Sequence, residues 1–339
     1  MRCRGSVPNA FMFTTAVTNR SRALLEFRVY RFHLKATGAG VLPNFVTNTV
    51  RGAFGRALRR LVCTFPRAGC GSCELAGSCP YAAVFEPRKP PQIHRLAQVR
   101  QTPRPFVLRT ETPGGRVSAG SELLFEMVLV GGTKRLLPYI TLAIRNMAAE
   151  GIGVRNHRAS FSLEEVRAKT KRGWSRVYSP EKGLRTTAAH PFRYSDFVAA
   201  SRPCKRITVR FLSPLRIRSR SGGLIRRNLR FEHLVKRLRD RLNMLSVFYC
   251  GGELPLDFRG LGERAEKVET ARSDLRWVDV SRYSRSQKQR HPMGGLLGEV
   301  TFVGDDLGEF LPLLYAGEYL HVGRFAVWGF GQIEVVSVE

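Results

Sequence analysis

The sequence predicts an α+β protein built from two tandem ferredoxin-like domains with a small cysteine-rich insertion. Segments with strand and helix periodicity follow one another in the order β, α, β, β, α, β, and the same order recurs further along the chain. The length of 339 residues exceeds that of one ordinary compact domain, and 43% of the residues are hydrophobic, enough for a core in each half.

The chain divides into four parts. The hydrophobic run in residues 1–22 is too short for a secretion signal, which argues against secretion. We expect these residues to form a flexible N-terminal extension. The first domain spans residues 23–170 and carries a cysteine-rich knuckle at 63–80. Residues 171–202 are polar and weakly patterned, which indicates a linker with peripheral strands, and the second domain spans residues 203–339.

The first domain opens with a strand and continues into an amphipathic helix. Residues 23–35 alternate apolar and polar side chains, and a slip of this alternation at Val29–Tyr30 predicts a β-bulge. In residues 44–62, apolar residues recur at the spacing of a helix. The other elements expected here are a short strand at 105–110, a strand at 121–130, a helix at 136–150 and a strand at 159–166.

The second domain repeats this order. A strand at 206–216 runs into a turn, and a helix at 229–248 has a leucine-rich stripe opposite a basic face. Residues 251–274 lack periodicity and predict a loop. The remaining elements expected are a basic hairpin arm at 277–294, a strand at 297–303, a short helix at 305–316, a glycine-rich loop and a final strand.

The charge balance indicates a polyanionic partner. The chain has 56 Lys+Arg against 27 Asp+Glu, a formal net charge of +29, and most of the basic residues are arginines. Arginine suits bidentate contacts with phosphate and stacking on bases, so nucleic acid is favoured over a membrane. No apolar run approaches the roughly 18 residues that a membrane span requires. We expect a cytoplasmic protein with no membrane partner.

The cysteines suggest a metal site in a reducing compartment. Seven cysteines, an odd number, argue against a secreted disulfide framework. Four of them lie within 17 residues and include a CxxC, with glycines between the thiols that permit tight turns. We predict a structural zinc ion held by Cys63, Cys70, Cys73 and Cys79. Thiols without metal and an iron–sulfur cluster are the alternatives, and a closed four-thiolate site would have no catalytic role.

One face of the helix at 44–62 is basic and contains two glycines. Mid-helix glycines destabilise a helix by roughly 1 kcal/mol each relative to alanine, so Gly52 and Gly55 suggest that something packs close to this face. The alternative is a solvated face with tolerated glycines. Arg51, Arg59 and Arg60 of this face are candidate RNA contacts, and Arg56 lies on the same face.

Two segments of the second domain are candidates for RNA contact. In the glycine-rich loop, glycines would let backbone N–H groups approach a phosphate while an arginine neutralises charge and aromatic rings face bases. A hairpin whose aromatic residues fill a core is the alternative for this loop. Its candidate residues are Gly323, Arg324, Trp328, Gly329, Phe330 and Gly331. Those of the basic arm are Arg282, Arg285, Lys288, Arg290 and His291.

Taken in order, several short motifs resemble those of the CRISPR-associated RAMP-superfamily endoribonucleases, which process precursor CRISPR RNA. In the first domain these motifs are Leu42-Pro-Asn-Phe, Arg51-Gly-Ala-Phe-Gly-Arg-Ala-Leu58, Cys73-x5-Cys79-Pro-Tyr and Phe85-Glu86. In the second domain they are Ser213-Pro-Leu, Arg282-x-Ser-Arg-Ser-Gln, Gly294-Gly-Leu-x-Gly298, His321-Val-Gly-Arg and Gly329-Phe-Gly331.

This resemblance implies an activity and its partners. It implies two ferredoxin-like folds side by side and a glycine-rich loop that contacts RNA. It also implies cleavage of CRISPR repeat RNA without a catalytic cofactor, in which a 2′-hydroxyl attacks the adjacent phosphate and leaves a 2′,3′-cyclic phosphate. The implied partners are repeat or guide RNA and other CRISPR effector subunits. A non-catalytic RAMP subunit that holds the guide-RNA handle is the alternative, and a zinc-containing DNA-binding protein is a weaker one.

The proposed chemistry requires a base, an acid and cations around the phosphate. Family members commonly place a histidine near the first helix, but residues 44–62 contain none. His33, at the end of the first strand, and His321, just before the glycine-rich loop, are therefore the candidate proton-transfer groups. Arg56 remains protonated, so it is expected to stabilise the transition state instead.

Overall fold

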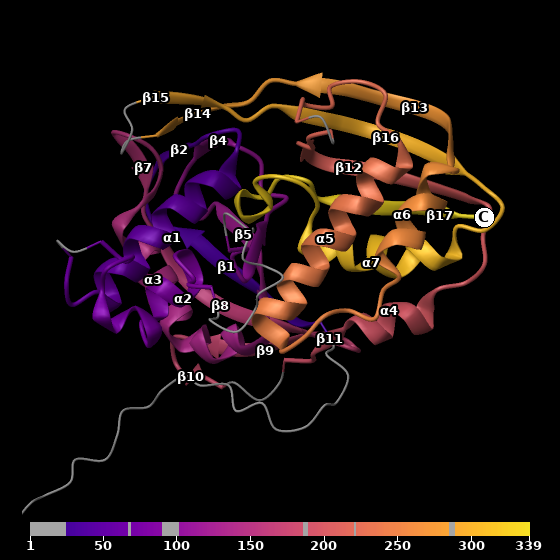
Figure 1. Ribbon diagram of the computed structural model, residues 1–339. Coiled ribbons are helices and arrows are strands. Elements are labelled where there is room, and N and C mark those ends of the chain that lie inside the picture. The colour runs from indigo at the N-terminus through magenta and orange to yellow at the C-terminus, as the bar shows by residue number, and fades with distance from the viewer. Residues whose placement is uncertain (1–24, 67–68, 90–101, 186–188, 220–221, 285–288) are drawn as a thin grey trace, which may run out of the picture.

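The computed structural model describes residues 25–66, 69–89, 102–185, 189–219, 222–284 and 289–339. The expected N-terminal extension lies outside these residues. Two sheets, each with helices packed on it, form two domains that lie next to each other (Figure 1). The N-terminal half of the chain builds one domain and the C-terminal half builds the other, so the predicted pair of ferredoxin-like domains is confirmed.

The first sheet has the strand order β10-β9-β8-β1-β5-β3, and β11 also pairs with β1. Four of its strands, in the order β8-β1-β5-β3, belong to the ferredoxin-like unit. The strands are β1 (Glu26–Ala36), β3 (Phe106–Arg109), β5 (Glu122–Val130), β8 (Phe161–Thr170), β9 (Gly173–Ser179), β10 (Gly183–Leu184) and β11 (Phe192–Arg193). The segment expected as a linker therefore supplies strands that extend this sheet.

Helices α1 (Val46–Val62) and α3 (Leu137–Glu150) share a core with one face of this sheet. Tyr30, Phe32 and Leu34 of β1 point into that core, because alternate strand residues face the same side. The other elements of this half are α2 (Pro80–Phe85) and the short strands β2 (Gly40–Leu42), β4 (Gly115–Val117), β6 (Ile152–Val154) and β7 (His157–Ala159). Short 3₁₀ turns span Glu74–Gly77 and Gly131–Leu136.

The predicted bulge at Val29–Tyr30 is wrong. The pairing of β1 with β5 is continuous there, and the irregularity in β1 lies between His33 and Leu34, where it pairs with β8. The alternation slips because Phe27 and Val29, on the opposite face from Tyr30, are buried in the core of the second domain. Both faces of β1 are therefore covered at its beginning and only one at its end.

The second sheet has the order β13-β16-β12-β17, the same arrangement as in the first domain. Its strands are β12 (Arg206–Leu215), β13 (Glu269–Val278), β16 (Gly295–Val303) and β17 (Ile333–Val338). Its helices are α5 (Phe231–Cys250), α6 (Phe258–Glu266) and α7 (Leu311–Leu320), and α4 (Tyr194–Ala200) packs against α7. Short 3₁₀ turns precede α7 at Gly308–Phe310 and lie in the glycine-rich loop at Ala326–Trp328.

The loop predicted at 251–274 is wrong, because this segment contains α6 and the start of β13. Most residues of β13 are exposed, since it is an edge strand, and its sequence therefore lacks apolar alternation. In α6, Gly260 and Gly262 weaken the helical pattern, and the Asp257 side chain caps the helix through the Gly260 N–H.

The basic arm forms a hairpin of β14 (Ser281–Ser284) and β15 (Gln289–Pro292). In Figure 1 it extends from the second sheet toward the side of the first domain that carries β2, β4 and β7. Arg285 and Lys288 lie outside the described residues, and for Arg282 and Arg290 only the backbone is described. His291 is half-buried and pairs with Arg282 across the hairpin.

Candidate nucleic-acid interface

The glycine-rich loop of the second domain docks on the first helix of the first domain. The Thr47 hydroxyl donates a hydrogen bond to the Trp328 carbonyl at 2.8 Å. The rings of Phe45 and Phe330 lie 4.5 Å apart between centroids, and Val327 is buried in the core of the first domain. We call this contact between α1 and residues 323–331 the junction.

Two glycines of the loop are required by close packing. Gly329 has φ of +87°, and a Cβ there would lie 2.5 Å from the Thr47 Oγ1. Gly331 has φ of +65°, and a Cβ there would lie 1.8 Å from the Val322 carbonyl oxygen. Any other residue would strain the backbone and push the loop away from its contacts.

Several backbone N–H groups of the loop are used within the protein. The N–H groups of Arg324, Trp328 and Gly331 already donate to the carbonyls of Arg216, Phe325 and Pro214. Backbone donors that are used within the protein cannot also hold a phosphate. These N–H groups are therefore not available to a phosphate.

The side chains of the loop divide into two groups. Arg324 is exposed and Trp328 is half-buried, so both are accessible to a ligand. Phe330 is fully buried, and its expected role in RNA contact is therefore wrong. Gly329 and Gly331 are buried as well, so they shape the loop but present no surface.

The basic face of α1 meets the loop through Arg51. Its guanidinium carbon lies 4.0 Å from the centre of the Trp328 ring and 5.2 Å from that of Phe85. Such cation–π contacts orient a guanidinium and still allow its N–H groups to bind phosphate. Arg56 is exposed one turn further along α1.

Other residues of this face have structural partners. Arg59 donates to the Pro66 carbonyl at 3.1 Å, and Arg60 forms an ion pair with Glu150. A Cβ at Gly55 would lie 3.1 Å from the Phe85 ring. The segment that passes close to Gly55 is therefore α2 of the protein itself.

His321 cannot reach a substrate in this structure, which corrects its expected catalytic role. Its imidazole is fully buried, and Nδ1 lies 3.1 Å from the Phe330 carbonyl oxygen. Burial, together with the nearby charges of Arg109 and Arg241, holds the pKa of His321 well below its usual value. The neutral ring therefore braces the back of the loop.

His33 lies on the opposite face of the first sheet from α1. It alternates along β1 with Phe32 and Leu34, which pack against the helices. Its Nε2 is 3.1 Å from a carboxylate oxygen of Glu122, and its Nδ1 is 3.8 Å from one of Glu165. His33 and Arg56 were expected to act together, but the sheet separates them.

The predicted zinc site is not supported. The described residues contain no group of three or more His, Cys, Asp or Glu side chains that could hold a metal ion. Burial raises the pKa of the Cys70 thiol. The guanidinium of Arg88 holds this segment instead, with donation to the carbonyls of Gly71 and Cys73 at 3.2 and 2.8 Å.

Sequence reasoning missed several residues around the junction. Thr47 gave no signal, because a threonine near the start of a helix is common. Arg216, Arg218 and Arg226 follow the Ser-Pro-Leu motif in a short basic run, which could have been recognised. Phe325 lies between two loop candidates, but only the structure shows its position.

The architecture defines a class of protein. Two ferredoxin-like domains, a glycine-rich loop docked on the first helix and accessible arginines beside it are the features of a RAMP-type RNA-binding protein. No helix in the described part of the chain is long and apolar enough to cross a membrane.

Two family models match the chain. Residues 209–333 match the model of the CRISPR-associated endoribonuclease Cas6, and residues 25–191 match a model named AF_1859_N and described as an N-terminal domain. An uncharacterized protein of Archaeoglobus fulgidus is 25% identical over 303 residues, which cover 87% of this chain and 93% of that protein. The C-terminal part of the chain, residues 209–333, therefore matches the Cas6 endoribonuclease family.

Solved structures share the fold. A Cas6 product complex has a TM-score of 0.55 at 17% identity and covers 91% of this chain and 100% of that chain. Thermus thermophilus Cas6 has a TM-score of 0.54 at 15% identity, with 92% and 99% covered. A chain of a partial Cas6-RT-Cas1–Cas2 complex has a TM-score of 0.58 at 14% identity, with 94% of this chain but 47% of that chain covered.

Proposed function

We propose that this protein is an endoribonuclease that cuts precursor CRISPR transcripts into guide RNAs without a metal ion. The junction carries this proposal, because it brings Arg51 and Trp328 from different domains into contact beside the exposed Arg56. Arginines next to an aromatic ring suit a strand with phosphates and unpaired bases. The Cas6 family model supports RNA cleavage as the type of reaction.

In the proposed reaction, a ribose 2′-oxygen bonds to the adjacent phosphorus and the bond from phosphorus to the 5′-oxygen breaks. The 2′-hydroxyl loses a proton and the leaving 5′-oxygen gains one, so the products are a 2′,3′-cyclic phosphate and a 5′-hydroxyl. Negative charge builds up on the phosphoryl oxygens. Arg56 stabilises that charge, while Arg51 and Arg324 hold neighbouring phosphates.

The proposed partners are the repeat RNA, its guide-RNA product and other CRISPR proteins. Matched structures include a Cas6 product complex and a Cas6-RT-Cas1–Cas2 complex, which supports both kinds of partner. The basic arm of β14 and β15 is a further proposed RNA contact, because it projects from the second sheet toward the first domain (Figure 1).

The test is incubation of the protein with the CRISPR repeat RNA of its own locus in EDTA. We expect a single cut whose upstream product ends in a cyclic phosphate, detected by its resistance to phosphatase until acid opens the ring. Arg56→Gln should slow single-turnover cleavage by roughly 100-fold, the usual effect of removing one donor to a developing oxyanion, with binding retained.

Two variants serve as controls. Arg60→Gln, on the same helix, should cleave at nearly the normal rate, because Arg60 is paired with Glu150. His33→Ala should also retain activity, because His33 lies on the other face of the sheet. Equal losses in Arg56→Gln and Arg60→Gln would contradict the assignment of Arg56.

A non-catalytic subunit that holds guide RNA is the second candidate function. The observation that favours it is the position of the two candidate histidines, since His321 is buried and His33 lies behind the sheet. Tight binding of every repeat RNA tested, with no cleavage, would establish this function and exclude the first.

A further inference from the structure

A row of arginine and aromatic side chains alternates along one edge of the second domain. We call it the arginine ladder, and its members in spatial order are Arg226, Trp277, Arg216, Phe325 and Arg324. The guanidinium carbon of Arg226 lies 4.7 Å from the Trp277 ring centre, and that of Arg216 lies 5.9 Å from the same ring. Arg216 also lies 5.9 Å from the Phe325 ring, and Arg324 lies 5.7 Å from it. Three separate segments therefore meet here: the loop after β12, strand β13 and the glycine-rich loop.

The charges of the ladder are not balanced by carboxylates. Among the described residues, no ion pair joins Arg216, Arg218, Arg226 or Arg324 to an acidic side chain. Burial lowers the pKa of Arg216, and the positive charges of Arg324, Arg218 and Arg226 lower it further. Arginine cannot relieve such repulsion by losing its proton, so the cluster costs stability until an anion binds.

Arg216 has a donor that lacks an acceptor in the described part of the structure. Its side chain is buried, at 9% exposure, and one terminal nitrogen donates to the Gly294 carbonyl at 2.7 Å. Its Nε is buried without a hydrogen-bond partner among the described residues. A buried guanidinium N–H without an acceptor is costly, so Arg216 is held here at an energetic cost.

A cavity of about 680 Å³ adjoins the ladder. Its basic lining residues are Arg216, Arg218, Arg237, Arg241 and Arg324. The one carboxylate that lines it, Asp240, accepts from Arg239 at 2.8 Å and also pairs with Arg237. The cavity therefore retains an excess of positive charge.

The conformation of Phe325 indicates that its position is under strain. It has φ of +68°, a left-handed conformation that is unfavourable for a bulky residue, and its ring lies between two arginines of the ladder. Strained residues of this kind concentrate at binding sites, where surrounding contacts hold them in place.

We propose that the arginine ladder and its cavity bind the phosphodiester backbone of a single-stranded RNA segment. Arg216 and Arg218 would hold phosphate oxygens beside the cavity. The exposed Arg226 and Arg324 would also bind phosphates through their N–H groups, while their guanidinium planes stack on bases. This inference rests on the proposed function in that the RNA is the substrate. It places a second contact on the same strand, because Arg324 of the ladder and Trp328 of the junction belong to one loop.

The test compares RNA binding by the ladder variant Arg226→Gln/Arg324→Gln with that of a matched control. The control, Arg259→Gln/Arg264→Gln, removes the same charge from helix α6, where both arginines pair with carboxylates. Anisotropy of labelled single-stranded repeat RNA is measured over a range of salt concentrations. We expect the ladder variant to bind at least tenfold more weakly. The slope of log affinity against log salt concentration should become shallower by about 0.7 for each phosphate contact removed. The control should stay within twofold of the unmodified protein.

Trp277→Leu provides a second measurement that keeps the net charge. It removes the ring between Arg226 and Arg216, so we expect weaker binding with an unchanged salt slope. Equal binding by the unmodified protein, the ladder variant and the control would overturn the inference. Cleavage of the same RNA is read separately on a denaturing gel. Ladder-dependent binding without cleavage would contradict the proposed function and leave the ladder assignment intact. Cleavage with no effect of the ladder variants would support the proposed function and contradict the ladder assignment.

Discussion

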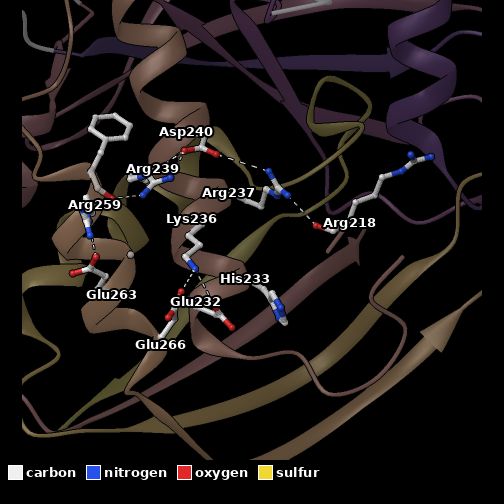
Figure 2. A pocket seen from close by; sticks show the side chains of 12 residues that line it. Arg218, Glu232, His233, Lys236, Arg237, Arg239, Asp240, Arg259, Glu263 and Glu266 are labelled. Carbon is white, nitrogen blue, oxygen red and sulfur yellow. Dashed lines mark hydrogen bonds and ion pairs between the residues drawn. The ribbon is translucent and has the colours of Figure 1, made fainter. Parts of the chain in front are cut away.

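Helix α5 lies between two arginine-rich regions of opposite character. On one side, between α5 and α6, a cavity of about 760 Å³ contains balanced charges (Figure 2). Lys236 there lies 2.7 Å from a carboxylate oxygen of Glu232 and 2.5 Å from one of Glu266, and Arg259 lies 2.8 Å from Glu263. On the other side is the arginine ladder, whose three guanidinium groups have no carboxylate partner among the described residues.

The net charge of +29 therefore comprises arginines that are neutralised within the protein and arginines that are not. In the α5–α6 pocket, positive side chains join two helices, and their charges are neutralised within the protein. Figure 2 shows Arg218, at the edge of this pocket, pointing away from its acidic residues. At the ladder the same residue type is left unbalanced, so its charge remains available to a polyanion.

Reversing one charge should produce the largest effect. Arg226→Glu would place a carboxylate in the ladder, where it attracts Arg216 and repels phosphate. We expect RNA affinity to fall by about 100-fold near 0.1 M salt, since a phosphate contact is lost and a repulsion is added. Arg259→Glu, measured in the same anisotropy assay, should change affinity by less than threefold. Similar losses in the two variants would show that net charge alone governs binding.

The pH dependence of stability should come next in size. The pKa of His321 is lowered in the folded protein, so its contribution to stability is complete above the unfolded pKa of about 6.5 and is lost as the pH falls below it. The slope contributed by this one group is at most about 1.4 kcal/mol per pH unit. We expect urea unfolding between pH 7.5 and 5 to show a shallower pH dependence in His321→Gln than in the unmodified protein. Parallel curves for the two proteins would contradict this prediction.

Removing the acidic partners should make the pocket resemble the ladder. In Glu232→Gln/Glu266→Gln, Lys236 loses both of its partners, and we expect the free energy of unfolding to fall by about 1 kcal/mol, the scale of partly exposed ion pairs. The measurement is urea unfolding at pH 7 without RNA. An unchanged midpoint would mean that these ion pairs contribute nothing measurable.

Sulfate should produce the smallest effect. Without RNA, sulfate at tens of millimolar should raise the melting temperature by a few degrees more than sodium chloride of equal ionic strength, because a bound anion relieves repulsion within the ladder. Arg226→Gln/Arg324→Gln should lose this difference, and Arg259→Gln/Arg264→Gln should keep it. A difference that persists in the ladder variant would indicate a sulfate site elsewhere.

Much of the fold could be predicted from local patterns. The elements of both ferredoxin-like units were recognised except α6 and β13, because apolar periodicity reports which face of a helix or strand is buried. Edge strand β13 was missed for the same reason, since an exposed strand carries no such pattern. The change in apolar alternation along β1 is visible in the sequence, but it does not mark a β-bulge. Its cause is a contact of β1 with the second domain.

The candidate site was predicted less completely. The resemblance implied two domains side by side, but the contact of α1 with the glycine-rich loop through Thr47 and Trp328 was not predicted. The burial of His321 and Phe330 could not be read from their motif, because a glycine-rich segment has the same sequence whether its aromatic rings face solvent or a core.

The sequence by itself determined the order of the elements, the excess of arginine and the glycines that the final loop requires, because each is encoded in residue type and short-range spacing. The packing of distant segments in the tertiary structure sets which arginines are neutralised by carboxylates and which are not. Arg216, Trp277 and Phe325 are far apart in the chain and meet only when the sheet and the loop pack together. The presence or absence of a nearby carboxylate is likewise set by packing, and in this protein it separates the charges that stabilise the fold from those that we propose bind RNA.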